Sequence, residues 1–309
     1  MKINWKIVGG FGAHIKSNRT ELVIQHKGTI TEIPIEDLSH FLVIGGHNIQ
    51  SSALTTLIKQ GVFISFCESD GEPIGYITPY EYTAFDEIRR LQESALTYSY
   101  ALECAQGSIQ SRILAIEKYA SVHGDTILFS GEMDILSGYS QEINNMVRIE
   151  EIRRIEQLVR DMYYEIISRI IDPVYHFRRR TGGPSQDPVN AVLSFGYGML
   201  SSACTKAIIG GHLHPSKGFL SRGKNSLVND LVNCWKTKMI DEKAIELIQS
   251  GLLKRDTYEI GKTRCILHDK VIEKLIQAFL ESVLLDVIDS QIDILVQSLN
   301  NEVPFRIIR

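Results

Sequence analysis

The chain lacks the features of a membrane, secreted or disulfide-stapled protein. No apolar run reaches the about 18 residues that a membrane-spanning helix needs. The first residues, MKINWKIVGG, do not show the charged-then-apolar pattern of a secretory signal. The five cysteines are widely spaced and form no CxxC pair, which argues against a disulfide framework and a zinc knot. We therefore expect a cytoplasmic protein without membrane contact, whose cysteines are buried thiols.

The chain has a small net negative charge, but acidic residues are scarce in one segment, which is net positive. The net charge of −4 taken alone argues against nucleic acid. From Pro173 to Lys236, however, eight lysines and arginines stand against two acids, so this segment carries +6 and the remainder −10. These basic residues are Arg178, Arg179, Arg180, Lys206, Lys217, Arg222, Lys224 and Lys236. Such segregation favours contact with a nucleic-acid backbone.

The hydrophobic pattern changes near residue 80. With 309 residues, 44% of them hydrophobic, the chain is long enough for a full core and two domains. Before residue 80, short β-rich runs alternate with turn signals, and one helix is expected at SSALTTLIKQG. The runs are Leu22 to Gln25, Ile30 to Ile35, Phe41 to Ile44, Val62 to Phe66 and Ile74 to Ile77. The sequence therefore predicts an α+β protein with a small β-domain over 1–80 and an α-helical domain over 81–309.

Helical spacing dominates the second part. Amphipathic patterns cover Leu91 to Leu102, Ile109 to Tyr119 and Ile152 to Ile166. The apolar stretch Val189 to Ile209, rich in small residues, predicts a central buried helix. A last pattern from Val271 to Ile288 suits a helix that faces the core or a dimer partner.

Glu156 is the first candidate for chemistry. Helical spacing places it on the same side as Val159 and Tyr163, close to the apolar face. An acid there is costly unless it is paired or binds a metal. The alternative is an i,i+4 ion pair with Arg160 on a solvated face. The spacing leaves both interpretations open.

Two basic loops provide the other candidates. Arg178, Arg179 and Arg180 precede a Gly-Gly-Pro break and suit either a solvated turn or a phosphate clamp. His212 and His214 lie in an extended loop without further ligands at zinc-finger spacing, so no isolated zinc site is predicted. The loop GFLSRGKN then leads into a helix with Asp230 as its single acid, either a solvated carboxylate or a remnant of a metal site.

These features occur in an order that resembles a known family. The quoted blocks are DLSHFLVIGGHNIQSSALTTLIKQGVFISFCESDGEPIGYITP in the β-domain, then Glu156 seven residues before Tyr163, DPVNAVLSFGYGML, GFL and SLVNDLVNCWK. They resemble the CRISPR-associated adaptation endonuclease and integrase, the first-numbered Cas protein, along nearly the whole chain. The resemblance implies a β-domain followed by a helical catalytic domain, and a homodimer formed largely through the β-domains.

The resemblance also implies a chemistry. In the family a glutamate, a histidine and a second acid hold Mg²⁺ or Mn²⁺, and members cut branched DNA and join short fragments into the repeat array by transesterification. Carried over, Glu156 stands at the glutamate, Ser221 at the histidine after GFL, Asp230 at the aspartate and Asn233 at the acid three residues further. We therefore expect Glu156 and Asp230 as catalytic residues, with Ser221 and Asn233 completing an impaired or reorganised metal site.

His214 is a further candidate, as a substitute for the missing histidine. The competing interpretation, which the loop favours, is a structural histidine that caps the turn before Pro215.

The expected DNA contacts come from the basic segment and are nonspecific in sequence. The candidates are Arg178, Arg179, Arg180, Lys217, Arg222 and Lys224. The resemblance adds a partner, the small ferredoxin-like second-numbered Cas protein.

Three functions stay open. The chain is an active metal-dependent DNA endonuclease and integrase with a weaker ligand set, or a DNA- and partner-binding member of the adaptation complex with little or no catalysis. The third is a dimeric interaction module that has left DNA, and the retained basic segment argues against it.

Overall fold

The N-terminal part of the molecule is a single six-stranded sheet. The computed structural model describes residues 5–69, 71, 73–80, 86–124, 127–182, 184–301 and 303–309. The strand order is β3-β2-β1-β4-β5-β6, with β1, β4 and β5 parallel and the other pairs antiparallel. The strands are β1 (Trp5–Ser17), β2 (Glu21–His26), β3 (Thr29–Pro34), β4 (His40–Ile49), β5 (Phe63–Cys67) and β6 (Pro73–Ile77).

The central strand β1 was not predicted from the sequence. Its apolar alternation is interrupted by glycines, and Gly10 and Gly12 adopt φ of +94° and +81°, which residues with a Cβ rarely do. The register with β4 shifts between Phe11 and His14, as at a β-bulge. Glycine in a strand interior usually weakens a strand prediction, and here it marks an irregularity in a long strand.

Both faces of the sheet are covered. On one face Val8, Phe41 and Val43 pack in a cluster with Leu57 of α1 (Ser51–Lys59). On the other face alternate residues such as Leu42 and Ile44 belong to the core of the helical part. The near-continuous apolar runs of β4 and β5 follow from this double coverage.

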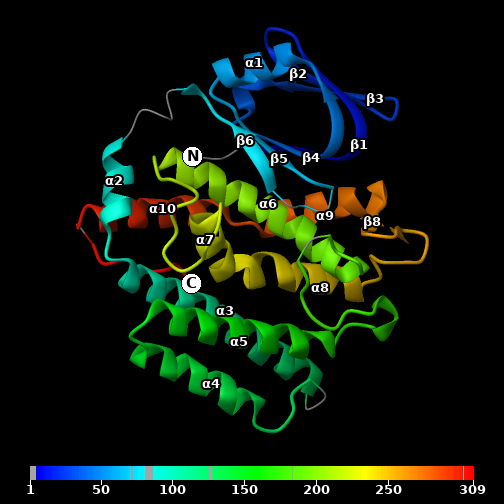
Figure 1. The fold of residues 1–309 in the computed structure, drawn as a ribbon. Helices are drawn as coiled ribbons and strands as arrows, with labels where there is room; N and C mark the ends of the chain where they lie inside the picture. Colours follow the sequence, from blue (N-terminus) through cyan, green and yellow to red (C-terminus); the bar gives the residue numbers. More distant parts are fainter. Residues whose placement is uncertain are drawn as a thin grey trace.

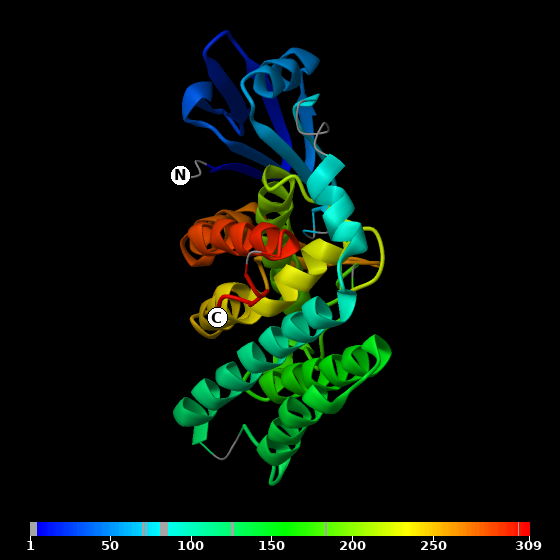
Figure 2. The same cartoon turned by 90° about the vertical axis from the view of Figure 1, so that its left-hand side faces the viewer.

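Layers of helices continue from the sheet toward the far end of the molecule. Figure 1 shows the sheet at one end, α6 beneath it, and α3, α5 and α4 furthest away; Figure 2, turned by 90°, shows the same order. The helices are α2 (Asp86–Ser94), α3 (Thr97–His123), α4 (Glu132–Glu142), α5 (Ile149–Ser168), α6 (Pro188–Gly210), α7 (Ser226–Lys236), α8 (Glu242–Gln249), α9 (Asp269–Ser282) and α10 (Leu285–Leu299), with a short hairpin of β7 (Tyr258–Ile260) and β8 (Cys265–Leu267). The predicted α+β class is confirmed.

The helix boundaries differ from the predicted patterns at two places. The pattern from Leu91 to Leu102 is divided between α2 and α3, and α3 then runs on through the next pattern. The last pattern is divided at Val283 and Leu284 into α9 and α10. Periodicity could not reveal these breaks, because apolar residues on both sides of each break join the same core. The domain boundary at residue 80 stays a prediction; β6 ends at Ile77 and α2 begins at Asp86.

Helix α6 forms the centre of the molecule, as its composition predicts. Asp187 caps it by accepting a 2.8 Å hydrogen bond from the Asn190 amide, and Pro188 occupies the first turn. Among the described helices it alone is long and apolar enough to cross a membrane, and 83% of that apolar window is buried inside the protein. All five cysteines are buried and free, as expected.

Glycines allow α6 to approach the sheet closely. A Cβ on Gly198 would overlap the backbone of Gly71, which lies between β5 and β6 with φ +86°. A polar contact reinforces the junction nearby. His40 on β4 lies 2.6 Å from the Ser65 hydroxyl and 3.2 Å from the Ser202 hydroxyl of α6, through Nε2. Burial, assisted by Lys206, lowers the pKa of His40 to about 3.

The contact at Gly198 predicts a large effect of one added methyl group. Gly198→Ala should lower the free energy of unfolding by about 2–3 kcal/mol, because the backbone of Gly71 cannot yield as a flexible side chain would. Gly210→Ala in the same helix is the control, since nothing lies within 4 Å of a Cβ there. Urea unfolding followed by circular dichroism measures both, and equal midpoints for the two variants would contradict the close contact.

The buried His40 predicts a pH dependence of stability. Native His40 stays neutral down to about pH 3, while in the unfolded chain it takes up a proton below its ordinary pKa of 6.5. The free energy of unfolding should therefore fall as the pH drops below 6.5, with His40 contributing about 2 kcal/mol of loss by pH 5. Urea unfolding at pH 7.5 and 5 should show this loss in the parent and in the exposed control His14→Gln, but not in His40→Gln. An unchanged loss in His40→Gln would rule out this origin.

Candidate functional site

A hollow beside α5 gathers several of the predicted site residues. It measures 420 Å³ and lies between α5, the loop of residues 219–222 and α7. We call it the Glu156 hollow. Its lining residues are Arg153, Glu156, Gln157, Arg160, Leu220, Ser221, Arg222, Asn229 and Asn233. The fold thus brings Glu156, Ser221, Asn233 and Arg222 together at one hollow, with Arg153 and Arg160 beside them.

Glu156 is buried and already paired. It is 5% exposed. Its Oε1 accepts a 2.9 Å hydrogen bond from Ser108 and lies 3.2 Å from Arg112 Nη1, and its Oε2 lies 3.3 Å from Arg160 Nη1. Burial alone would raise the pKa of Glu156, but Arg112, Arg160 and Lys236 together lower it. The i,i+4 ion pair with Arg160 is therefore present. The alternative also expected a solvated helix face, which is wrong because Glu156 is buried.

Two cations lie behind Glu156 in the interior. Arg112 of α3 is fully buried, and neither its Nε nor its Nη2 has a hydrogen-bond partner among the described residues. Lys236 is buried too; burial, followed by Arg112, lowers its pKa to about 7, against the opposing effect of Asp241 and Glu156. Its ammonium lies 5.3 Å from the ring centre of Tyr197. Arg112 therefore places a permanent positive charge behind Glu156, whereas Lys236, with its pKa of about 7, is only partly protonated at neutral pH.

Asp230 holds the loop in place. It is 1% exposed, and its carboxylate accepts three backbone hydrogen bonds, from Phe219 (2.6 Å), Leu220 (3.1 Å) and Ser221 (2.6 Å). Burial raises the pKa of Asp230, against the lowering effect of these bonds. Gly218 allows the close approach, because a Cβ there would lie 2.6 Å from Asp230 Oδ2. Asp230 is thus neither a solvated acid nor part of the hollow's lining, and its catalytic and metal-binding role stays a prediction.

The donors in the Glu156 hollow do not fit a divalent metal. Mg²⁺ and Mn²⁺ favour several anionic oxygens. Both oxygens of Glu156 are engaged by cations, and Ser221 and Asn233 offer only neutral oxygens. Across the described ranges, no group of three His, Cys, Asp or Glu could hold a metal ion. The arrangement instead presents guanidinium groups to whatever enters the hollow.

The predicted DNA-binding residues are distributed over several surfaces. Arg178 and Arg179 are exposed. Arg180 turns inward, where its guanidinium donates 2.8 Å hydrogen bonds to Asn190 and Ser194. Lys217 lies 3.3 Å from Glu93 and Arg222 lies 2.9 Å from Glu150, so both are ion-paired. Lys224 is exposed.

Some residues of this region were missed or placed differently by the sequence. Arg153 faces the hollow and pairs with Glu150 at 2.9 Å, the same carboxylate that pairs with Arg222. Its spacing, three residues before Glu156 on one helix, is the signal that could have included it. His214 accepts hydrogen bonds at Nδ1 from Ser216, at 3.2 Å from the amide and 2.9 Å from the hydroxyl. This supports the turn-forming role of His214.

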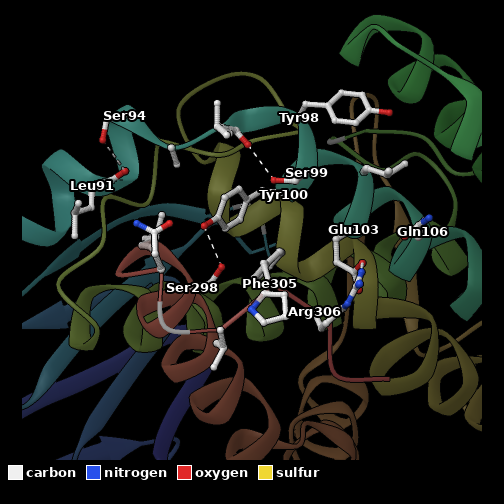
Figure 3. Close-up of a pocket in the computed structure, with 17 residues that line it drawn as sticks. Leu91, Ser94, Tyr98, Ser99, Tyr100, Glu103, Gln106, Ser298, Phe305 and Arg306 are labelled. Atoms are coloured by element: carbon white, nitrogen blue, oxygen red, sulfur yellow. Dashed lines mark hydrogen bonds and ion pairs between the residues drawn. The ribbon is translucent and has the colours of Figure 1, made fainter.

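A larger hollow lies elsewhere and has a different character. It measures 690 Å³ and is bounded by the α2–α3 turn and the C-terminal residues (Figure 3). Tyr100 and Phe305 form part of its wall with ring centres 5.0 Å apart. Its main charged pair, Glu103 and Arg306, is joined at 2.8 Å. Because these charges neutralise each other, this hollow offers no surplus of positive charge to a nucleic acid.

The comparisons with known proteins point to one family. The family model described as CRISPR associated protein Cas1 matches residues 7–281. A CRISPR-associated Cas1 protein of Methanospirillum hungatei is 66% identical over 302 residues, which cover 98% of this chain and 100% of that protein.

Solved structures show the same fold at low sequence identity. A casposase bound to an integration product superposes with a TM-score of 0.85 and 19% identity, covering 97% of this chain and 92% of that one. A chain of a Cas6-RT-Cas1–Cas2 complex has the same TM-score with 16% identity, covering 99% of this chain and 36% of that one. The resemblance that the sequence blocks carried is confirmed, and the chain belongs to the Cas1 family of CRISPR adaptation endonucleases and integrases.

Proposed function

We propose that the chain is a DNA-binding member of the CRISPR adaptation machinery in which metal-dependent cleavage and strand transfer are impaired. The observation that carries this proposal is the composition of the Glu156 hollow. Three guanidinium groups and one carboxylate line it, and that carboxylate is paired to two arginines. Ser221 and Asn233 supply neutral groups where the family has a histidine and an acid. Mg²⁺ or Mn²⁺ should therefore bind weakly or not at all.

DNA contact is supported by the placement of the remaining positive charge. Arg178 and Arg179 are exposed, and Arg153, Arg160 and Arg222 line the Glu156 hollow. Guanidinium groups bind phosphate oxygens in pairs of hydrogen bonds and read no base sequence in doing so. The casposase of the same fold holds an integration product, which is consistent with a nucleic-acid surface on this fold. We infer binding to duplex or branched DNA without sequence preference.

The partners follow from the same proposal. Edge strand β6 exposes Ile74 and Tyr76, and edge strand β3 exposes Ile30. Uncovered edges with apolar side chains favour pairing with another chain, here a second β-domain in a homodimer. The fold neighbour assembled with Cas2 supports the small ferredoxin-like protein as the further partner.

The first prediction from the proposed function concerns DNA binding. Affinity for a branched duplex should fall steeply between 50 and 200 mM salt, because each phosphate contact releases counterions. Reversing two exposed charges with Arg178→Glu and Arg179→Glu should weaken binding about tenfold and reduce the salt slope by about two. Fluorescence anisotropy measures both quantities. Charge reversal at Lys16 and Arg19 on the β-domain is the control. A DNA affinity that does not change with salt concentration would exclude a phosphate interface.

The second prediction concerns catalysis. Ser221→His combined with Asn233→Glu should raise Mn²⁺ affinity and cleavage of branched DNA, because a nitrogen ligand and a carboxylate return beside Glu156. Each single change should do less than the pair, since ligands of one metal act together. Isothermal titration with Mn²⁺ and a gel assay of cleavage measure the two effects.

Adding Glu156→Ala to the double variant is the control for the second prediction. It should remove the gain in a protein that circular dichroism shows to be still folded, because the loss of Glu156 also leaves Arg112 buried and unpaired. If the parent already cleaves and joins DNA at full rate in Mn²⁺, the alternative of an active endonuclease with a weaker ligand set is correct. If the double variant folds and binds DNA but stays as inactive as the parent, Ser221 and Asn233 do not belong to the site.

A further inference from the structure

The Glu156 hollow has the chemistry of an anion site. Three guanidinium groups reach it from two directions, Arg153 and Arg160 from α5 and Arg222 from the loop after Leu220. Glu156 is the only carboxylate among the described lining residues, whereas Glu150 and Asp161 pair with these arginines from outside the lining. A divalent cation would meet repulsion from these groups, whereas a phosphate would meet charge-assisted hydrogen bonds.

The positions of the guanidinium groups are set by contacts that leave donors for a ligand. Arg153 directs its Nε at the Leu220 carbonyl oxygen and its Nη1 at Glu150, 2.9 Å away. Arg222 reaches the same Glu150 oxygen through Nη2, also at 2.9 Å. Glu150 is 64% exposed at its side chain, so its pairing with both arginines is screened by solvent and yields readily to a competing anion. A guanidinium carries five N–H donors, and these contacts use only part of them.

The interior adds one permanent positive charge, that of Arg112, which lies behind Glu156 and is buried. The buried Lys236 has a pKa of about 7, and the buried Asp241 opposes both cations. In the low dielectric of the interior, the field of Arg112 is weakly screened by salt. The carboxylate of Glu156 is therefore compensated from behind, and its charge repels an entering anion less than an unpaired carboxylate would.

We propose that the Glu156 hollow takes a DNA phosphate group directly on Arg153, Arg160 and Arg222, without a bridging metal ion. This inference rests on the proposed function, because it names where that DNA surface holds a phosphate. Asn229, Asn233 and Ser221 supply additional neutral donors at the same hollow. The loop keeps its shape without the phosphate, because Asp230 occupies the amides of residues 219–221.

The test compares DNA affinities for which a metal-free site and a metal-bridged site predict different values. Arg153→Gln with Arg222→Gln should weaken binding of a branched duplex about tenfold in EDTA and reduce the salt slope by about two. Asn233→Asp adds a carboxylate of the same shape, so it should weaken binding about threefold in EDTA. The parent should bind DNA equally in EDTA and in Mn²⁺, whereas a metal-bridged site predicts tighter binding of the parent in Mn²⁺. Lys16→Gln with Lys59→Gln and Asn48→Asp, all on the β-domain surface, are the matched controls.

Two further arms identify the source of the phosphate. Inorganic phosphate alone should raise the melting temperature of the parent, and the double arginine variant should lose that rise. Duplexes with a 5′-phosphate and with a 5′-hydroxyl then distinguish a terminal phosphate from an internal phosphodiester, since only the former makes affinity depend on the end group.

The outcomes separate this inference from the function on which it rests. If the parent binds no DNA, both are wrong. If the parent binds DNA with a steep salt dependence but the arginine and Asn233 variants behave as their controls, the interface lies elsewhere and only the inference is overturned. Tighter binding of the parent in Mn²⁺ than in EDTA also overturns it.

Discussion

The ion pair between Glu156 and Arg112 is the interaction on which the helical part depends. It joins α5 to α3, with Arg112 fully buried and only 7% of the Glu156 side chain exposed. Removing one partner would leave the other charge buried and unpaired, which costs about 3–5 kcal/mol. The two helices are therefore fixed relative to each other by the carboxylate that we predict to stand at the family's glutamate. Folding alone consequently constrains the position of Glu156.

Asp230 has a structural role that does not depend on a metal ion. Its carboxylate satisfies three consecutive amides of the loop that precedes α7, and Gly218 provides the space. Loss of this acid would leave three backbone donors without an acceptor. The side chains of Ser221 and Asn233 line the hollow and hold no comparable set of loop amides.

The sequence predicted those features that depend on local spacing. Helix α6, the change of pattern near residue 80 and the pairing of Glu156 with Arg160 all follow from period and separation along the chain. It could not predict β1, because glycines interrupt the alternation of that strand. It could not predict the burial of Arg112 either, because this residue interrupts the apolar pattern between Ile109 and Ile113 and is buried only where α5 lies against α3. The hydrogen-bond donors to Asp230 could not be predicted either, because they are backbone amides of a loop with no periodic pattern.

On the proposed function, the charge balance explains how a phosphate site could exist without a metal ion. In the pattern that the resemblance implies, carboxylates are neutralised by a dication, so the set presents little net charge to DNA. In this chain Glu156 is the carboxylate that lines the hollow, and it pairs with Arg112 and Arg160, while Asp230 accepts hydrogen bonds from the loop amides. Binding of a phosphate requires only a favourable net potential, whereas metal-dependent cleavage requires an ion at the reacting oxygen. The residues at positions 221 and 233 would then affect cleavage more than binding.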